Sequence, residues 1–184
     1  MRVSRPLAPV LAFTLAAVGC TSMKFGSQRI DGRDASKVKT FCVLVAPQDK
    51  VPMDPGLRET IATRFVPSIT RHLKEKGYSP APEETADVVV ATQAMIGVAN
   101  VDAIRWNQTV AAWYPWGPIG VGYYASSSIG KDVTFVIDIG DPRAGKLYWR
   151  SWAAGPVEVG AQHDPSKVDR LVDKVLADVP RAKS

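Results

Sequence analysis

The sequence predicts one globular α/β domain of the α+β type: a two-layer arrangement with a mostly antiparallel sheet and two main helices on one of its faces. Two observations lead to this fold class. Runs rich in apolar and β-branched residues, typical of strands, occupy residues 38–46, 87–96, 132–140 and 146–155. Two other segments, 54–76 and 164–179, carry apolar residues at helical spacing. Two amphipathic helices can together cover one face of such a sheet.

The first expected strand, 38–46, ends before Pro47, and a helix follows it. Asp54-Pro55 is a helix start signal, because the carboxylate can cap free N–H groups and proline fits the first helical position. Gly77 is a fitting stop. Pro67 lies inside this helix and removes one main-chain hydrogen bond, so we expect a kink or break near 65–66. The apolar stripe of the helix consists of Leu57, Ile61, Phe65, Ile69 and Leu73.

The second half of the chain predicts a hairpin and a final helix. The continuous apolar start of segment 87–96 suggests a central strand, and 101–110 is expected to return as a more polar strand. Strands 132–140 and 146–155 flank the turn 141–145, with Phe135, Ile137 and Ile139 on one face. Asp164-Pro165 repeats the helix start signal, and Pro180 ends that helix.

Composition and charge fit a folded domain without a nucleic-acid partner. Hydrophobic residues make up 46% and charged residues 22% of the 184 residues, close to the averages of soluble globular proteins. The formal net charge is +5, but the basic residues do not form the concentrated patch that nucleic-acid binding usually requires.

Residues 1–20 have the layout of a secretory signal: two arginines, an apolar stretch and then small residues. The apolar stretch is shorter than the roughly 20 residues of a membrane-spanning helix, which favours a cleaved leader. Its ending, Ala17-Val18-Gly19-Cys20, resembles the lipobox of bacterial lipoproteins, although Leu is more usual at the position of Ala17. The resemblance implies cleavage after Gly19 and a diacylglyceryl thioether on Cys20.

These features predict three parts: a lipoprotein signal peptide (1–19), a flexible tether (20–37) and a single globular domain (38–184). The tether is polar and dotted with glycine. Two or more acyl chains on Cys20 would hold the domain firmly at a membrane, because each buried methylene adds about 0.8 kcal/mol. The likeness to Gram-negative lipoproteins implies a periplasmic location, and the absence of Asp at position 21 favours the outer membrane over the inner one. Cys42 is expected to be an inert core residue.

Four motifs follow one another along the mature chain: Lys39-Thr40-Phe41, Leu73 to Tyr78, Ala86 to Val90, and the hairpin from Val136-Ile137-Asp138-Ile139-Gly140-Asp141 to Leu147-Tyr148-Trp149-Arg150. Their order resembles a family of bacterial lipoproteins that carry the domain of unknown function numbered 4136. The resemblance implies an anchored periplasmic α/β domain and transfers no catalytic residue. The chain departs from the family pattern at Tyr148, where a smaller apolar residue is more common, and in a short glycine-aromatic middle segment.

Few residues offer catalytic chemistry. His72 and His163 lack metal-ligand spacing and are expected to be solvated, so we expect neither a metal nor a cofactor. The serines at 126–128 lack a nucleophile elbow. Asp138 and Asp141 could form a glycosidase-like carboxylate pair. Asp141, however, also fits a turn residue. Asp138 is expected to meet Lys146 or Arg150 across the hairpin, a pairing that contributes at most about 1 kcal/mol if it is exposed.

One cluster of aromatic residues, interleaved with glycine and proline, is a candidate contact surface. Such rings bury large areas at interfaces, so they could contact a partner protein, a glycan or the membrane interface. The alternative is that they pack over the uncovered face of the sheet. The cluster consists of Trp113, Tyr114, Trp116, Tyr123 and Tyr124.

Three functions remain open. The leading interpretation is a non-enzymatic binding or envelope-structural lipoprotein that contacts an envelope protein or glycan. The alternative is a periplasmic hydrolase acting on envelope glycans through Asp138 and Asp141. A small-molecule carrier would need an apolar cavity between helices and sheet.

Overall fold

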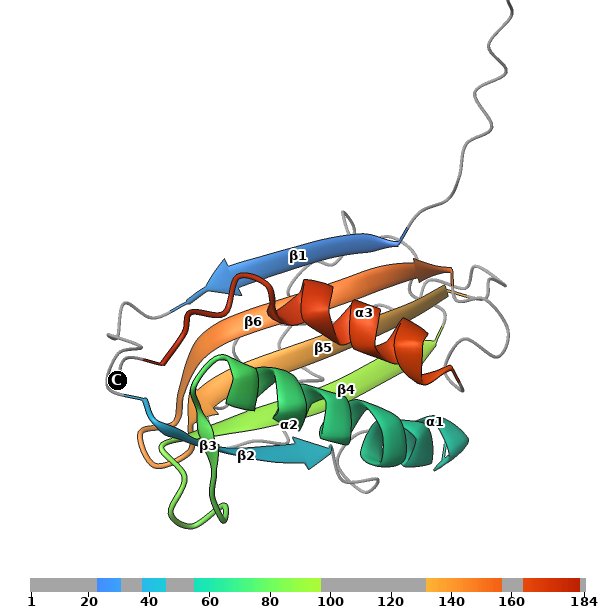
Figure 1. Cartoon of the computed structure of the whole chain (residues 1–184). Helices are drawn as coiled ribbons and strands as arrows, with labels where there is room; N and C mark the ends of the chain where they lie inside the picture. The colour runs from blue at the N-terminus through green and yellow to red at the C-terminus, as the bar shows by residue number, and fades with distance from the viewer. Residues whose placement is uncertain (1–22, 31–37, 46–54, 97–131, 157–163, 183–184) are drawn as a thin grey trace, which may run out of the picture.

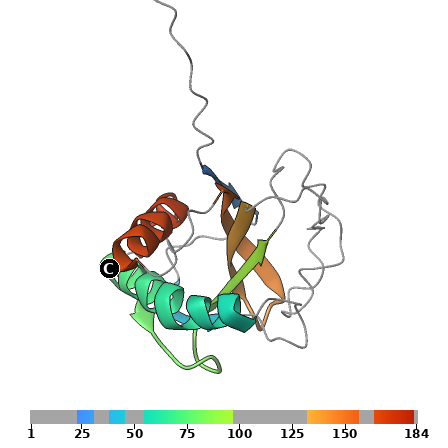
Figure 2. The ribbon, with the colours of Figure 1, turned by 90° about the vertical axis from the view of Figure 1, so that its right-hand side faces the viewer.

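The computed structural model describes residues 23–30, 38–45, 55–96, 132–156 and 164–182. The described residues form one six-stranded sheet with helices on one side of it (Figures 1 and 2). The two-layer α/β arrangement expected from the sequence is therefore confirmed. Along the chain the strands are β1 (Lys24–Arg29), β2 (Thr40–Val45), β3 (Ser79–Pro80), β4 (Val88–Ile96), β5 (Asp132–Asp141) and β6 (Lys146–Pro156).

The strand order in the sheet is β1-β6-β5-β4-β2-β3. The pairs β1/β6, β6/β5 and β5/β4 are antiparallel, whereas β4/β2 and β2/β3 are parallel. A parallel pair needs a crossover connection, and the helical segment between β2 and β4 provides it. The β5–β6 hairpin and the central position of β4 agree with the prediction, while the return strand expected at 101–110 lies outside the described residues.

The helical segment after β2 is interrupted as Pro67 predicts. It consists of α1 (Pro55–Thr60), a π-helical turn η2 (Ile61–Phe65) and α2 (Val66–Glu75). The backbone N–H of Val66 donates to the carbonyl of Ile61, five residues earlier. The wider turn lies directly before the proline, which cannot donate a main-chain hydrogen bond and would crowd a regular preceding turn. The predicted break is thus a π-helical turn.

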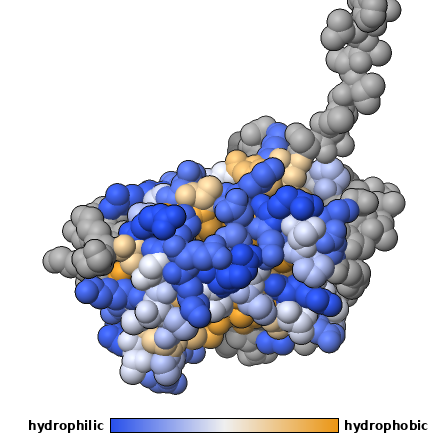
Figure 3. Space-filling view, in the orientation of Figure 1, coloured by the Kyte–Doolittle hydropathy of each residue, from blue (hydrophilic) through white to orange (hydrophobic). Residues whose placement is uncertain are grey.

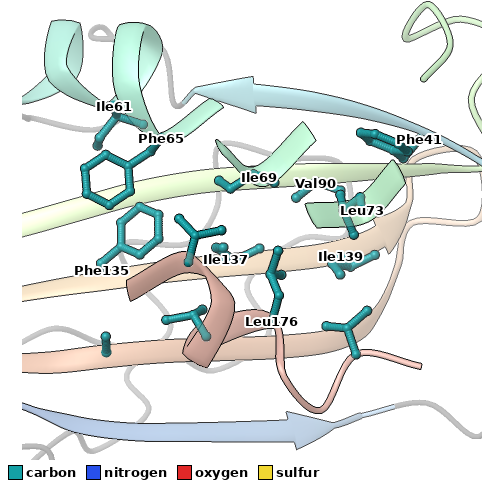
Figure 4. Close-up of a cluster of buried hydrophobic side chains, with 14 of the residues drawn as sticks. Phe41, Ile61, Phe65, Ile69, Leu73, Val90, Phe135, Ile137, Ile139 and Leu176 are labelled. Atoms are coloured by element: carbon teal, nitrogen blue, oxygen red, sulfur yellow. The ribbon is translucent and has the colours of Figure 1, made fainter. Parts of the chain in front are cut away.

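The core lies between the sheet and the helices. Phe135, Ile137 and Ile139 of β5 point to the helices and are at least nine-tenths buried. The rings of Phe65 and Phe135 pack 4.7 Å apart between centroids (Figure 4). The apolar stripes predicted for both helical segments therefore meet this face of the sheet.

The last helix, α3 (Pro165–Leu176), begins as its start signal predicts. The Asp164 side chain accepts a hydrogen bond from the backbone N–H of Ser166 at 2.9 Å, the geometry of an N-cap. Beyond α3, the Tyr78 hydroxyl donates to the carbonyl of Pro180 at 2.9 Å. These contacts hold the end of the chain against the end of α2.

The expectation of a flexible tether at 20–37 is wrong for its middle part. Lys24–Arg29 form the edge strand β1, which pairs antiparallel with β6 over six residues, from Lys24↔Ala154 to Arg29↔Trp149. An edge strand with one partner can be polar, because half of its backbone groups and much of its side-chain surface face water. The folded domain therefore begins much nearer to Cys20 than residue 38.

Candidate functional site

The candidate carboxylate Asp138 lies near the centre of the sheet, on the face away from the helices. Its neighbours Ile137 and Ile139 belong to the helix-facing core, so the alternation of a strand turns Asp138 to the opposite face. Directly across the hairpin stands Arg150. The buried apolar residues Val89, Ala91 and Leu147 form a second cluster on this far face.

Asp138 and Arg150 form a buried two-bond ion pair. Nε and Nη2 of Arg150 donate to Oδ1 and Oδ2 of Asp138, each at 2.5 Å. Asp138 is 5% and Arg150 1% exposed. Burial raises the pKa of the Asp138 carboxyl, while the hydrogen bonds and charge of Arg150 act in the opposite direction. Arg150 is one of the two partners expected from the sequence, and the pair is buried.

Asp141 has the turn role that its sequence position indicates. Its Oδ1 accepts hydrogen bonds from the backbone N–H groups of Arg143 and Ala144, at 2.8 and 3.0 Å. Its Oδ2 accepts one from the Tyr148 hydroxyl at 3.0 Å. Tyr148 thus supplies a side-chain donor to this turn.

A glycan hydrolase would need one carboxyl to donate a proton and the other to act on the sugar or on water. Both oxygens of Asp138 accept hydrogen bonds from an arginine, and both oxygens of Asp141 accept hydrogen bonds within the turn. The arrangement of the two carboxyls therefore gives the hydrolase alternative no support.

Of the remaining candidate residues, the structure describes His72 but not the lipidation site or the aromatic cluster. Cys20, His163 and the aromatic cluster Trp113, Tyr114, Trp116, Tyr123 and Tyr124 lie outside the described residues. The side chain of His72 is only 12% exposed, between Glu75 and Asp173 at 3.7 and 3.8 Å, so the expectation that it is solvated is wrong. Within the described ranges, no group of three or more His, Cys, Asp or Glu could hold a metal.

Cys42 is half-buried on the far face beside the Val89 cluster. Burial, followed by the charges of Glu83 and Glu84, raises the pKa of its thiol. A raised pKa lowers the thiolate fraction, in agreement with an inert cysteine. Among the described helices, none is long and apolar enough to cross a membrane.

The start of β1 is fitted closely to β6. A Cβ on Gly26 would lie 2.3 Å from Cζ2 of Trp152, so the indole occupies the space that any larger residue would need. Gly155 adopts φ +151°, and a Cβ there would lie 2.9 Å from the α-carbon of Met23. β1 and β6 therefore approach each other closely at two glycines. Gly26 of β1 leaves room for Trp152, and Gly155 of β6 leaves room for Met23.

β1 also contacts α3. The Ser27 hydroxyl donates to Oδ2 of Asp178 at 2.5 Å, and Nζ of Lys174 lies 5.2 Å from the ring centroid of Phe25, within cation–π range. Sequence reasoning missed β1. Lys24–Arg29 contains a single large apolar residue, Phe25, so it lacks the alternation that marks a strand.

Sheet order, helix placement and the β5–β6 hairpin define a small two-layer α/β domain. Residues 27–181 match the family described as "Domain of unknown function (DUF4136)". Because this match covers most of the chain, the chain belongs to that family, as the motifs of its sequence indicate. No curated protein matches the chain.

Solved structures of low sequence identity share the fold. A DUF4136 family protein from Bacteroides thetaiotaomicron is 16% identical, with a TM-score of 0.53 over 84% of this chain and 94% of that chain. A PDZ domain protein from Parabacteroides distasonis is 17% identical, with a TM-score of 0.52, over 89% of this chain but 38% of its own length. At these identities the likeness to these two structures concerns the fold alone. The PelC dodecamer from Paraburkholderia phytofirmans is 12% identical, with a TM-score of 0.46 over 89% of this chain and 100% of that chain.

Proposed function

We propose that this DUF4136 protein is a lipoprotein anchored through Cys20 to the periplasmic side of a bacterial membrane. The absence of Asp at position 21 favours the outer membrane. Its domain acts as a non-enzymatic binding or envelope-structural module, and its partner is an envelope protein or glycan. The lipobox-like Ala17-Val18-Gly19-Cys20 supplies the anchor.

The observation that carries this proposal is the position of β1. The strand begins at Lys24 and is built into the sheet, so only a few residues separate the expected lipid on Cys20 from a folded domain. Such a short connection between lipid and domain favours a module held at a membrane surface over an enzyme that moves freely in the periplasm.

The positions of the candidate carboxyls favour a binding role. The β5–β6 hairpin is stabilised by the ion pair between Asp138 and Arg150 and by the hydrogen bonds that Asp141 accepts in the turn. Since these carboxyls were the best catalytic candidates in the sequence, their structural roles favour a binding module over a hydrolase.

The anchor is tested by replacing Cys20 with alanine in the full-length chain. The wild-type protein is expected in the membrane fraction, with intact mass showing residues 1–19 removed and acyl chains present. Cys20→Ala is expected to carry no acyl chains in its intact mass and to lose the cleavage after Gly19, because both steps depend on the lipobox cysteine. The matched control is Cys42→Ala, which removes the other cysteine and is expected to stay membrane-bound and acylated. Native protein without acyl mass, or Cys20→Ala protein that still carries acyl chains, would contradict the proposal.

The binding role is tested at the aromatic cluster. Replacing Trp113 and Trp116 with alanine is expected to abolish the cross-links that the wild-type protein forms with envelope components in intact cells, since aromatic anchors dominate many interfaces. Gln28→Ala, at an exposed residue of β1, serves as a control outside the cluster. An unchanged cross-linking pattern in a variant with a wild-type unfolding curve would reject the contact role of these tryptophans.

A further inference from the structure

The membrane anchor and the folded domain are separated by a very short chain. Met23 is the first described residue, and three residue steps join it to Cys20. Since an extended chain advances about 3.6 Å per residue at most, the α-carbons of Cys20 and Met23 lie no more than about 11 Å apart. Met23 is fixed by its close contact with Gly155, so the lipid must enter the membrane beside the start of β1.

Helix α3 runs beside β1 in the same direction. Lys174 lies over Phe25, and Asp178, one helical turn later, accepts a hydrogen bond from Ser27. From Lys174 back to Pro165 a helix extends about 13 Å at 1.5 Å per residue. The first turns of α3 therefore project past Phe25 toward the side on which β1 begins (Figure 1).

The charges of α3 are separated onto two sides. Asp169 and Asp173 face α2, where they contact Arg71 at 2.7 Å and His72 at 3.8 Å. Lys167, Arg170 and Lys174 follow one another at spacings of three and four, which places them on one stripe of the helix. Because Lys174 of this stripe lies over Phe25, the basic side of α3 is the side toward β1.

β1 adds to this surface. Lys24 is exposed at its start, and Phe25 is a large apolar residue that is 36% exposed. The helix-covered side of the molecule is mostly hydrophilic, with a small apolar area close to where the chain leaves toward its N-terminus (Figure 3). Two acidic groups lie nearby: Asp178 accepts a bond from Ser27, and Asp164 caps α3. Basic side chains around one aromatic residue suit a surface of lipid phosphates.

We propose that this basic edge, defined as Lys24, Phe25, Lys167, Arg170 and Lys174, lies against the anionic phosphate-bearing surface of the membrane that holds Cys20. The proposal rests on the lipoprotein function proposed above. It fixes the orientation of the domain: the turn between β5 and β6 then points away from the membrane, because β1 pairs with the far end of β6. From Lys146 to Ala154, the partner of Lys24, β6 extends about 27 Å.

The orientation is tested by fluorescence quenching in vesicles. Full-length, acylated protein in a Cys42→Ala background carries a fluorophore at one new cysteine, Arg170→Cys or the matched exposed position Ala144→Cys in the β5–β6 turn. The vesicles contain phosphatidylethanolamine and phosphatidylglycerol, with a fraction of lipid bearing a nitroxide on its head group. Quenching is expected to be several-fold stronger at position 170 than at position 144. Equal quenching, or stronger quenching at position 144, would overturn the proposal.

A charge reversal supplies the second arm. Lys167→Glu with Lys174→Glu is expected to reduce quenching at position 170 several-fold in the same vesicles, while the protein stays bound through its acyl chains. Quenching unchanged by the reversal would refute the electrostatic part of the contact. Intact mass of the protein before reconstitution separates the two proposals, since absence of acyl chains would defeat the lipoprotein function and leave no anchored protein to orient.

Discussion

Replacing Arg150 with methionine is expected to lower the free energy of unfolding by about 3–5 kcal/mol, because it leaves the buried Asp138 carboxylate without its cation. Arg150 and Asp138 are 1% and 5% exposed, and two hydrogen bonds of 2.5 Å join their side chains. The loss should appear in chemical denaturation as a lower midpoint with an unchanged slope. A control on the same hairpin is Arg143→Met, at an exposed arginine that donates to the carbonyl of Glu84, for which we expect at most about 1 kcal/mol.

The double variant Asp138→Leu with Arg150→Met distinguishes a lost contact from a stranded charge. Apolar residues in place of a buried ion pair are often neutral or stabilising, so the double variant should recover most of the stability that Arg150→Met loses. If the double variant is as unstable as the single one, the stranded carboxylate is not the cause of the loss.

The same variant should respond to acid in a characteristic direction. Burial raises the pKa of Asp138 from its ordinary value of 3.8 against the opposing effect of Arg150, so in Arg150→Met the pKa of the folded state is expected to rise further. Between that value and the raised pKa the folded state binds more protons than the unfolded state, so lowering the pH stabilises the folded variant. The deficit relative to wild type should therefore shrink from pH 7 toward about pH 4. Hydrogen bonds from Ser68 and Arg71 lower the pKa of Asp169, so protonation of this carboxyl destabilises the folded state of both proteins in acid. The variant must therefore be compared with the wild type at each pH.

The elements predicted best from the sequence are those determined by local physics. Asp164 caps α3 as its position before proline indicates, and Asp141 holds the hairpin turn. Pro67 marks the place at which the helical hydrogen bonding changes. In each case one side chain or one missing N–H settles the conformation of its neighbours, so a single sequence contains the required information.

The missed features depend on partners distant in the sequence. The alternation of apolar residues in β5 correctly predicts the face of the sheet on which Asp138 lies. The burial of Asp138, however, depends on Arg150 across the hairpin and on Val89 and Ala91 of β4. β1 pairs with residues at least 120 positions away. A short polar run contains no local sign of such a partner, so it was interpreted as a tether.

The second large effect on stability is expected where β1 packs against β6. Gly26→Leu is expected to lower the free energy of unfolding by about 1–3 kcal/mol through overpacking. The new side chain would occupy the space of the Trp152 indole, since even a Cβ would lie 2.3 Å from one of its carbons. Gln28→Leu is the matched control, because Gln28 is exposed on the same strand and the same face; its change should stay within about 0.5 kcal/mol. Similar unfolding midpoints for the two variants would show that Trp152 can move at no cost.

The substitution at Gly26 also connects the fold to the proposed orientation. If leucine displaces β1 from β6, the anchor is joined to the rest of the domain by a longer free chain, although Cys20 and its acyl chains are unchanged. Membrane attachment should then persist while quenching of the fluorophore at position 170 by the head-group nitroxide falls toward the value at position 144. Gln28→Leu should keep the wild-type quenching at both positions. A Gly26→Leu protein that keeps the wild-type difference would mean that the basic residues of α3, and not the short link through β1, hold the domain at the membrane surface.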